Sequence, residues 1–122
     1  MSVRVVRLGS GRAKNEGLRV GTVRRPPRGV KKQDYAKLGY YDVWLPELAP
    51  SAGLIKTAHA DWKRFAERYR REMREQEHLL QLLARLSRDG NFAVGCYCED
   101  ESRCHRSILR EILAGHGARI AV

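Results

Sequence analysis

Chemically reactive side chains crowd one short segment, residues 96–106, which runs Cys-Tyr-Cys-Glu-Asp-Glu-Ser-Arg-Cys-His-Arg. It holds all three cysteines of the chain and one of its four histidines. An apolar run at residues 92–95 predicts a strand before it, and the apolar spacing after it predicts a helix. Ligands gather where the strands of α/β proteins end, so we expect any active site to be centred here.

Metal binding is one interpretation of this segment. Cys96, Cys98, Cys104 and His105 are four candidate ligands, and zinc takes such sets tetrahedrally. The spacing within two pairs of these residues argues against a single shared metal ion. Side chains two apart on an extended strand point to opposite faces, so Cys96 and Cys98 share an ion only if the strand has ended. Neighbouring side chains on a helix diverge by roughly 100°, which separates Cys104 from His105.

Thiol chemistry is the second interpretation, with Cys96, Cys104 and His105 as the candidate catalytic residues. A thiol at the strand end or helix start is a nucleophile, and the imidazole is its base or, when charged, stabilises the thiolate. An arginine six residues after the strand-end cysteine, as in tyrosine phosphatases and rhodanese, does not follow Cys96 or Cys98, because positions 102 and 104 are Ser and Cys. The third interpretation is structural, since Cys104 lies on the apolar stripe of the last helix, where buried cysteine is common.

Arginines in two regions predict an anion-binding site. Ser102 suits the N-cap of a helix over residues 103–114, whose first free N–H groups attract anions. Residues 1–38 carry eleven Lys and Arg against two acids, and such one-sided charge suits phosphate groups or nucleic acid. The candidate anion-binding residues are Arg24, Arg25, Arg28, Arg103 and Arg106.

The remaining pattern predicts the elements that position these side chains. Strands are expected over residues 3–8, 18–23, 40–45, 92–97 and 118–122. Helices are expected over residues 58–88, with a bend near 74–77, and over residues 103–114. This order predicts a single α/β domain, residues 1–122, with an open, mainly parallel sheet flanked by helices.

The cellular setting is expected to be the cytoplasm. No apolar stretch approaches the ~20 residues of a membrane span, and Arg4 and Arg7 interrupt any signal-peptide core. Three clustered cysteines do not suit a disulfide scaffold, which favours a reducing compartment. We therefore expect no membrane partner.

Several motifs resemble the family named domain of unknown function 488. They are the Cys-His-Arg ending of residues 96–106, the run Arg-Arg-Pro-Pro-Arg-Gly-Val at residues 24–30, the run Trp-Leu-Pro-Glu-Leu-Ala-Pro-Ser at residues 44–51, and the helix from Trp62 to Met73. The resemblance spans roughly residues 15–118. It implies a small α/β domain and supplies no established reaction.

The resemblance also ranks the cysteines. It implies that Cys96 and Cys104, eight residues apart, belong to the family pattern, whereas Cys98 does not. Many members carry an Asp-Arg pair near the end of the second strand, where this chain has Thr22-Val23-Arg24 and no Asp. If that Asp takes part in the chemistry of other members, we expect this chain to differ from them or to lack the activity.

Two functions remain as expectations. The first is an enzyme acting on a phosphate-bearing substrate, a nucleotide or nucleic acid, between residues 96–106 and the basic segment 24–29. The alternative is a non-catalytic module that binds nucleic acid or protein. A Cys/His loop stabilised by zinc is compatible with either.

Overall fold

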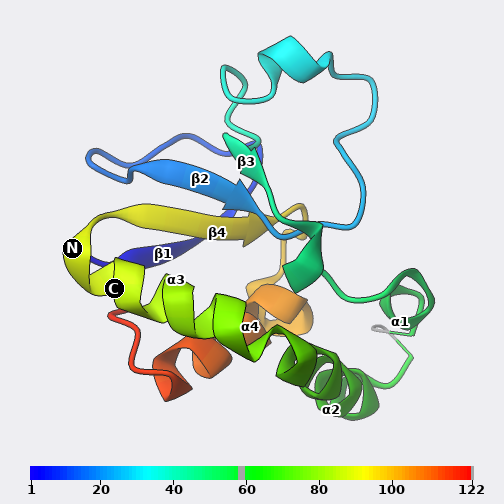
Figure 1. Ribbon diagram of the computed structural model, residues 1–122. Helices are drawn as coiled ribbons and strands as arrows, with labels where there is room; N and C mark the ends of the chain where they lie inside the picture. The colour runs from blue at the N-terminus through cyan, green and yellow to red at the C-terminus, as the bar shows by residue number, and fades with distance from the viewer. Residues whose placement is uncertain (58–59, 122) are drawn as a thin grey trace.

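A four-stranded parallel sheet organises the computed structural model, which describes residues 1–57 and 60–121 (Figure 1). The sheet order is β1-β4-β2-β3, and every pair of neighbours is parallel. The strands are β1 (Val3–Arg7), β2 (Leu18–Gly21), β3 (Val43–Trp44) and β4 (Phe92–Cys96). All five residues of β4 are buried, as expected for a central strand covered on both faces. The predicted α/β class and parallel sheet are confirmed.

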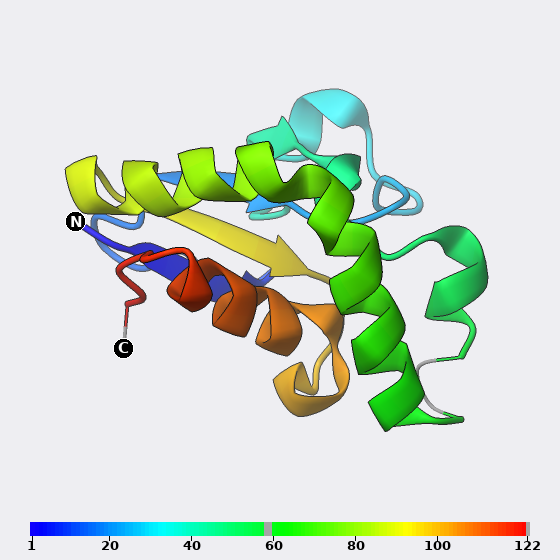
Figure 2. The same cartoon turned by 60° about the horizontal axis from the view of Figure 1, so that its bottom comes forward.

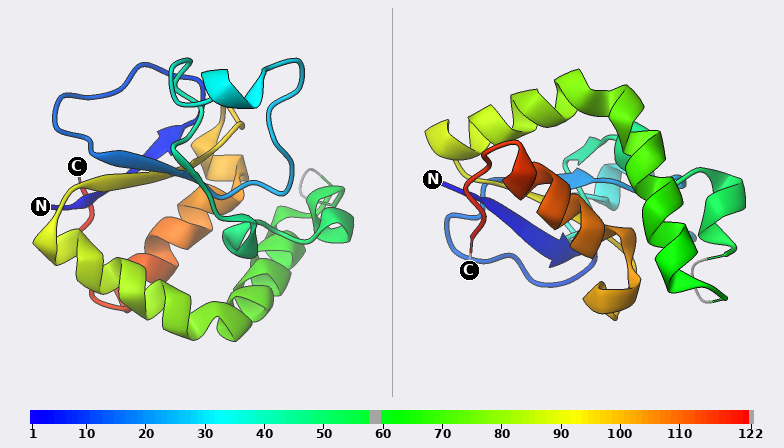
Figure 3. Two further views of the ribbon diagram at one scale, coloured as in Figure 1. Left: turned by 45° about the horizontal axis from the view of Figure 1, so that its top comes forward. Right: turned by 90° about the horizontal axis from the view of Figure 1, so that it is seen from below.

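The helices pack on one face of this sheet (Figures 2 and 3). They are α1 (Ala52–Ile55), α2 (Trp62–Met73), α3 (Glu77–Asp89) and α4 (His105–Gly115). Strand residues that alternate toward this face, such as Val20 and Val94, share a core with α2, α3 and α4. The sheet is therefore flanked by helices on one side and covered by loops on the other.

The long helical segment bends where the sequence predicts. Phe65, Tyr69 and Met73 bury one stripe of α2, and the Asp61 carboxylate caps its start by accepting from the Arg64 N–H at 3.1 Å. A 3₁₀ turn, Arg74–Gln76, then separates α2 from α3. The bend lets α2 and α3 both follow the surface of the core. The predicted helical residues 58 and 59 lie outside the described part of the chain.

A buried ion pair supports the loops on the other face of the sheet. Arg19 of β2 is 0% exposed and donates to the Glu16 carboxylate at 2.8 Å. Its guanidinium also donates to the carbonyls of Ser10, Gly11 and Gly39, which ties the loop after β1 to the loop before β3. Burial alone raises the pKa of Glu16, but the hydrogen bond and charge of Arg19 outweigh it and lower that pKa.

The C-terminal strand expected over residues 118–122 is wrong for the residues described. Ile120 forms only an isolated parallel bridge with Val3, flanked by hydrogen bonds from Val3 N–H to Arg119 and from Ala121 N–H to Val3. Two hydrogen bonds are too few to form a ladder, although the contact still covers the edge of β1. Residue 122 lies outside the described part.

Among the residues described, no helix has the length and apolar content needed to span a bilayer.

Candidate active site

The first two cysteines lie at the carboxyl end of the central strand. Cys96 is the last residue of β4 and is 1% exposed, whereas Cys98 lies two residues beyond it and is exposed. Because the strand has ended, its alternation no longer forces the two side chains apart. Cys98 lies close enough to Cys104 and Cys96 for the three thiols to influence one another's pKa.

The start of α4 differs from the prediction in a way that matters for the site. The Asp100 carboxylate accepts from the Ser102 N–H at 3.0 Å and caps a separate 3₁₀ turn, Glu101–Arg103. The N-cap of α4 is therefore Cys104 and not Ser102, and its backbone is extended (φ −128°, ψ 148°). An extended Cys104 removes the expected divergence from His105, and Cys104 Sγ lies 3.7 Å from His105 Nδ1.

His105 is held from the end of β2. Its Nε2 lies 2.8 Å from the carbonyl oxygen of Thr22 and 3.2 Å from Thr22 Oγ1. A carbonyl only accepts, so Nε2 carries the proton and Nδ1 presents its lone pair toward Cys104. Burial lowers the pKa of His105 to about 4. The imidazole is thus neutral at pH 7 and can accept a proton but not act as a cation.

The pKa values of the three thiols are shifted in different directions. Hydrogen bonding to the Cys104 and Cys96 thiols, aided by the charge of Arg106, holds the pKa of Cys98 well below its ordinary value. Hydrogen bonds to the other two thiols, together with burial, raise the pKa of Cys96. The accessible thiol is therefore also the one that ionises most easily.

The cluster also has the composition of a metal site. Ligand atoms of Cys96, Cys104 and His105 all lie within 4.8 Å of one another, and all three residues are buried. The bond from His105 Nε2 to a backbone carbonyl is the support that metal-bound histidines usually have. The cluster could therefore bind a metal ion.

A cavity of about 490 Å³ joins the thiols to the basic segment after β2. Its walls include Cys96, Cys98 and His105 on one side. The charged groups around it are all cationic in the part of the chain that the structure describes; they are Arg24, Arg25, Arg28 and Lys56. The carboxyl ends of β2 and β4 are adjacent in the sheet, which is why segments more than 70 residues apart in sequence meet here.

The five candidate arginines occupy different positions. Arg25 and Arg28 line the cavity, and Arg24 lines it while donating to the carbonyls of Ala49 and Pro50. Arg106 is buried and donates to the carbonyl of Cys98 at 2.7 Å, so it stabilises the loop that carries Cys98. Arg103 is exposed and is not among the cavity residues.

Comparison with known proteins identifies the family. A family model described as the active DUF488-N3 subclade matches residues 3–117. The chain belongs to the DUF488 family. A relative in Escherichia coli K12, the uncharacterized protein YeaO, is 27% identical over 116 residues, which cover 93% of this chain and 97% of YeaO. No solved structure matches.

The sequence pattern does not indicate several residues of the candidate site. Thr22 is fully buried between β4 and His105, yet in the sequence it stands out only as part of a segment that lacks an Asp. Lys56 lines the cavity but belongs to no motif, and Tyr97 lines it but, although it lies within residues 96–106, is not used by the metal or thiol interpretation. Their position after α1 and after β4 is a consequence of how the strand ends converge, and only the strand order could have indicated it.

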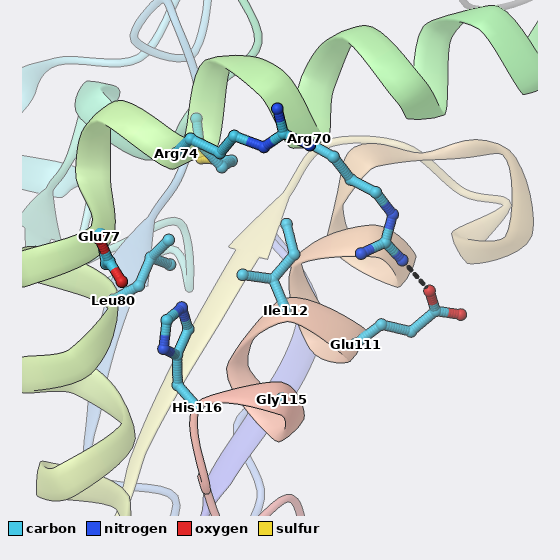
Figure 4. A pocket seen from close by; sticks show the side chains of 9 residues that line it. Arg70, Arg74, Glu77, Leu80, Glu111, Ile112, Gly115 and His116 are labelled. Atoms are coloured by element: carbon cyan, nitrogen blue, oxygen red, sulfur yellow. Dashed lines mark hydrogen bonds and ion pairs between the residues drawn. The ribbon is translucent and has the colours of Figure 1, made fainter.

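A separate cavity of about 440 Å³ lies between α2, α3 and α4, away from the cysteines (Figure 4). Met73, Leu80 and Ile112 contribute its apolar surface, while Arg70 is paired with Glu111 at its edge. Among the described residues, none lines both this cavity and the cysteine cavity. Its exposed Arg74 therefore offers a charge-matched control for experiments on the site.

Proposed function

We propose that this DUF488 protein is an enzyme that uses a thiol of the cysteine cavity on a phosphate-bearing substrate. The observation that carries the proposal is the cavity itself, which combines two cysteines and a neutral histidine with four cationic side chains. Phosphate is a dianion with three acceptor oxygens, and arginine side chains bind it as paired donors. The family description, an active subclade, supports catalysis.

Each residue has a role in this proposal. Cys98 is the thiol that a substrate can reach, because it is exposed and lines the cavity. Cys96 and Cys104 are buried behind it and donate hydrogen bonds to its sulfur. His105 presents the free lone pair of Nδ1 beside the thiols, 3.7 Å from Cys104 Sγ, and is the available base. Arg24, Arg25 and Arg28 bind the phosphate group.

Alkylation with protection tests both halves of the proposal. Iodoacetamide at pH 7, followed by peptide mass spectrometry, should label Cys98 first, and inorganic phosphate should slow that labelling. Replacing both Arg25 and Arg28 with Ala should abolish the protection, whereas Arg74→Ala in the distant cavity should preserve it. Labelling of all three thiols at one rate contradicts the assigned thiol, and labelling unaffected by phosphate contradicts the anion site.

Zinc bound by the cysteine cluster is a second candidate, favoured by the 4.8 Å grouping of Cys96, Cys104 and His105. With Cys98 as a fourth ligand, the set would be the Cys₃His composition of structural zinc sites. Protein purified without a metal-affinity tag should then hold about one zinc per chain, and Cys104→Ser should lose it. Zinc far below one per chain contradicts this candidate and leaves the thiol proposal intact.

A further inference from the structure

A second cavity adjoins the cysteine cavity and shares part of its wall. Its volume is about 530 Å³, and it lies at the carboxyl end of β1, beside the end of β4. Arg25, Arg28 and Tyr97 line both cavities. The two cavities therefore flank one cationic partition, and each has the size of an ordinary small-molecule site.

Two tyrosine rings give the second cavity an aromatic surface. Tyr40 and Tyr97 are half-buried and lie edge to face, with ring centres 6.3 Å apart. The Tyr97 hydroxyl donates to the Arg25 carbonyl at 2.8 Å, which fixes its ring against the basic segment. A Cβ added at Gly9 would approach the Tyr40 ring to 3.2 Å, so the glycine turn packs closely on that ring. These rings are held in place before any ligand arrives.

The backbone and charge around the rings suit a phosphate placed between the cavities. Pro26 and Pro27 also line the second cavity, and their fixed φ angles stiffen the segment that carries Arg25 and Arg28. Arg7 lines the cavity as well, and its guanidinium is paired with the exposed Glu99 at 3.4 Å. The positive charge is thus concentrated at the shared partition rather than spread around the rings.

We propose that the second cavity binds the base of a mononucleotide, while Arg25 and Arg28 hold its phosphate at the entrance to the cysteine cavity. The inference rests on the proposed function and adds the substrate class to it. Aromatic side chains bind bases through their π-faces, which every base has, so purine and pyrimidine nucleotides both fit. A sugar phosphate lacks this planar group, so only its phosphate would be bound, by Arg25 and Arg28.

Calorimetric titration with AMP, UMP and ribose 5-phosphate separates these contributions. The two nucleotides should bind about 5- to 150-fold more tightly than ribose 5-phosphate, the range expected for one stacked base. Tyr40→Leu should remove this advantage and leave ribose 5-phosphate binding unchanged. Tyr40→Phe, which keeps the ring, and Arg74→Ala, in the distant cavity, should both preserve the advantage.

The outcomes distinguish the two proposals. Equal affinity of wild-type protein for ribose 5-phosphate and the nucleotides overturns the base subsite and leaves the phosphate site standing, whether or not the variants fold. A folded Tyr40→Leu protein that keeps the nucleotide preference also overturns the subsite. Failure of all three ligands to bind overturns the subsite and the phosphate site together.

Discussion

His105 Nε2 lies 2.8 Å from the carbonyl oxygen of Thr22, so the end of β2 holds the first residue of α4. This bond fixes which ring nitrogen faces the thiols, and the adjacent Thr22 hydroxyl donates to the Gly95 carbonyl of β4 at 3.0 Å. One threonine thereby connects the two central strands to the candidate base.

Thr22→Val should cost about 1 kcal/mol of folding free energy. The substitution removes one buried hydroxyl, but the Gly95 carbonyl keeps its bond from the Thr22 N–H, and the Thr22 carbonyl still accepts from His105. Urea unfolding measures the loss. Nitrogen NMR of the imidazole should still show the proton on Nε2, and a switch to Nδ1 would disprove the role given to the backbone carbonyl.

The stability of the metal-free protein should fall between pH 6.5 and pH 4 through His105. Burial lowers its folded pKa to about 4, outweighing the opposing effects of the Thr22 carbonyl and of Cys98, whereas the unfolded value is about 6.5. Over that interval the unfolded chain binds a proton that the folded chain does not, so acid favours unfolding by roughly 3 kcal/mol. Urea unfolding of wild type and His105→Asn across this range isolates the effect, because shared carboxylates cancel. Parallel stability profiles for the two proteins would rule it out.

Arg19→Met should destabilise the protein by about 3–5 kcal/mol. The change leaves the Glu16 carboxylate buried without its partner and removes the donors to three loop carbonyls. Arg85→Met is the matched control, because Arg85 pairs with Asp89 on the exposed side of α3 and should change stability by less than about 0.5 kcal/mol. Equal losses for the two variants would refute the importance of burial.

Gly95→Ala should cost roughly 1–3 kcal/mol, because its Cβ would lie 2.5 Å from the Val6 backbone oxygen in the neighbouring strand. The strands must separate to admit the methyl group, directly beside Cys96. Gly53→Ala in α1 meets open space and should be neutral or gain up to about 1 kcal/mol. Thermal unfolding of both variants checks the contrast; an unaffected Gly95→Ala protein would contradict the close approach.

The sequence predicted which helices and strands form better than it predicted the residues at which they begin and end. Apolar spacing placed α2, α3, the bend between them and β4, because burial of one face sets the period of each pattern. The predicted start of α4 at residue 103 was wrong because this short segment contains two N-caps, Asp100 for a 3₁₀ turn and Cys104 for α4. Asp100 takes the Ser102 N–H, so Ser102 serves the 3₁₀ turn and Cys104 begins the helix.

The candidate site could be predicted only in part. Cys96, His105 and Arg24 were placed at strand ends and loops by their neighbours in sequence, and the structure brings them to one cavity. Arg19 and Arg106 had no signal of burial, because a charged residue reveals its partners only once distant carbonyls surround it. Tyr40 and Tyr97 meet through the order β1-β4-β2, which no local pattern specifies.

The position of β4 also governs when the protein can fold. It lies between β1 and β2, which do not pair with each other, yet it begins only at Phe92 of 122 residues. During synthesis β1 has no partner strand, and β2 can pair only with the short β3, until β4 emerges. Long-range strand pairing is slow, so the nascent chain has an extended period of vulnerability to proteolysis and aggregation. The same late strand carries Cys96, so a chain truncated before β4 can have neither a complete sheet nor the candidate site.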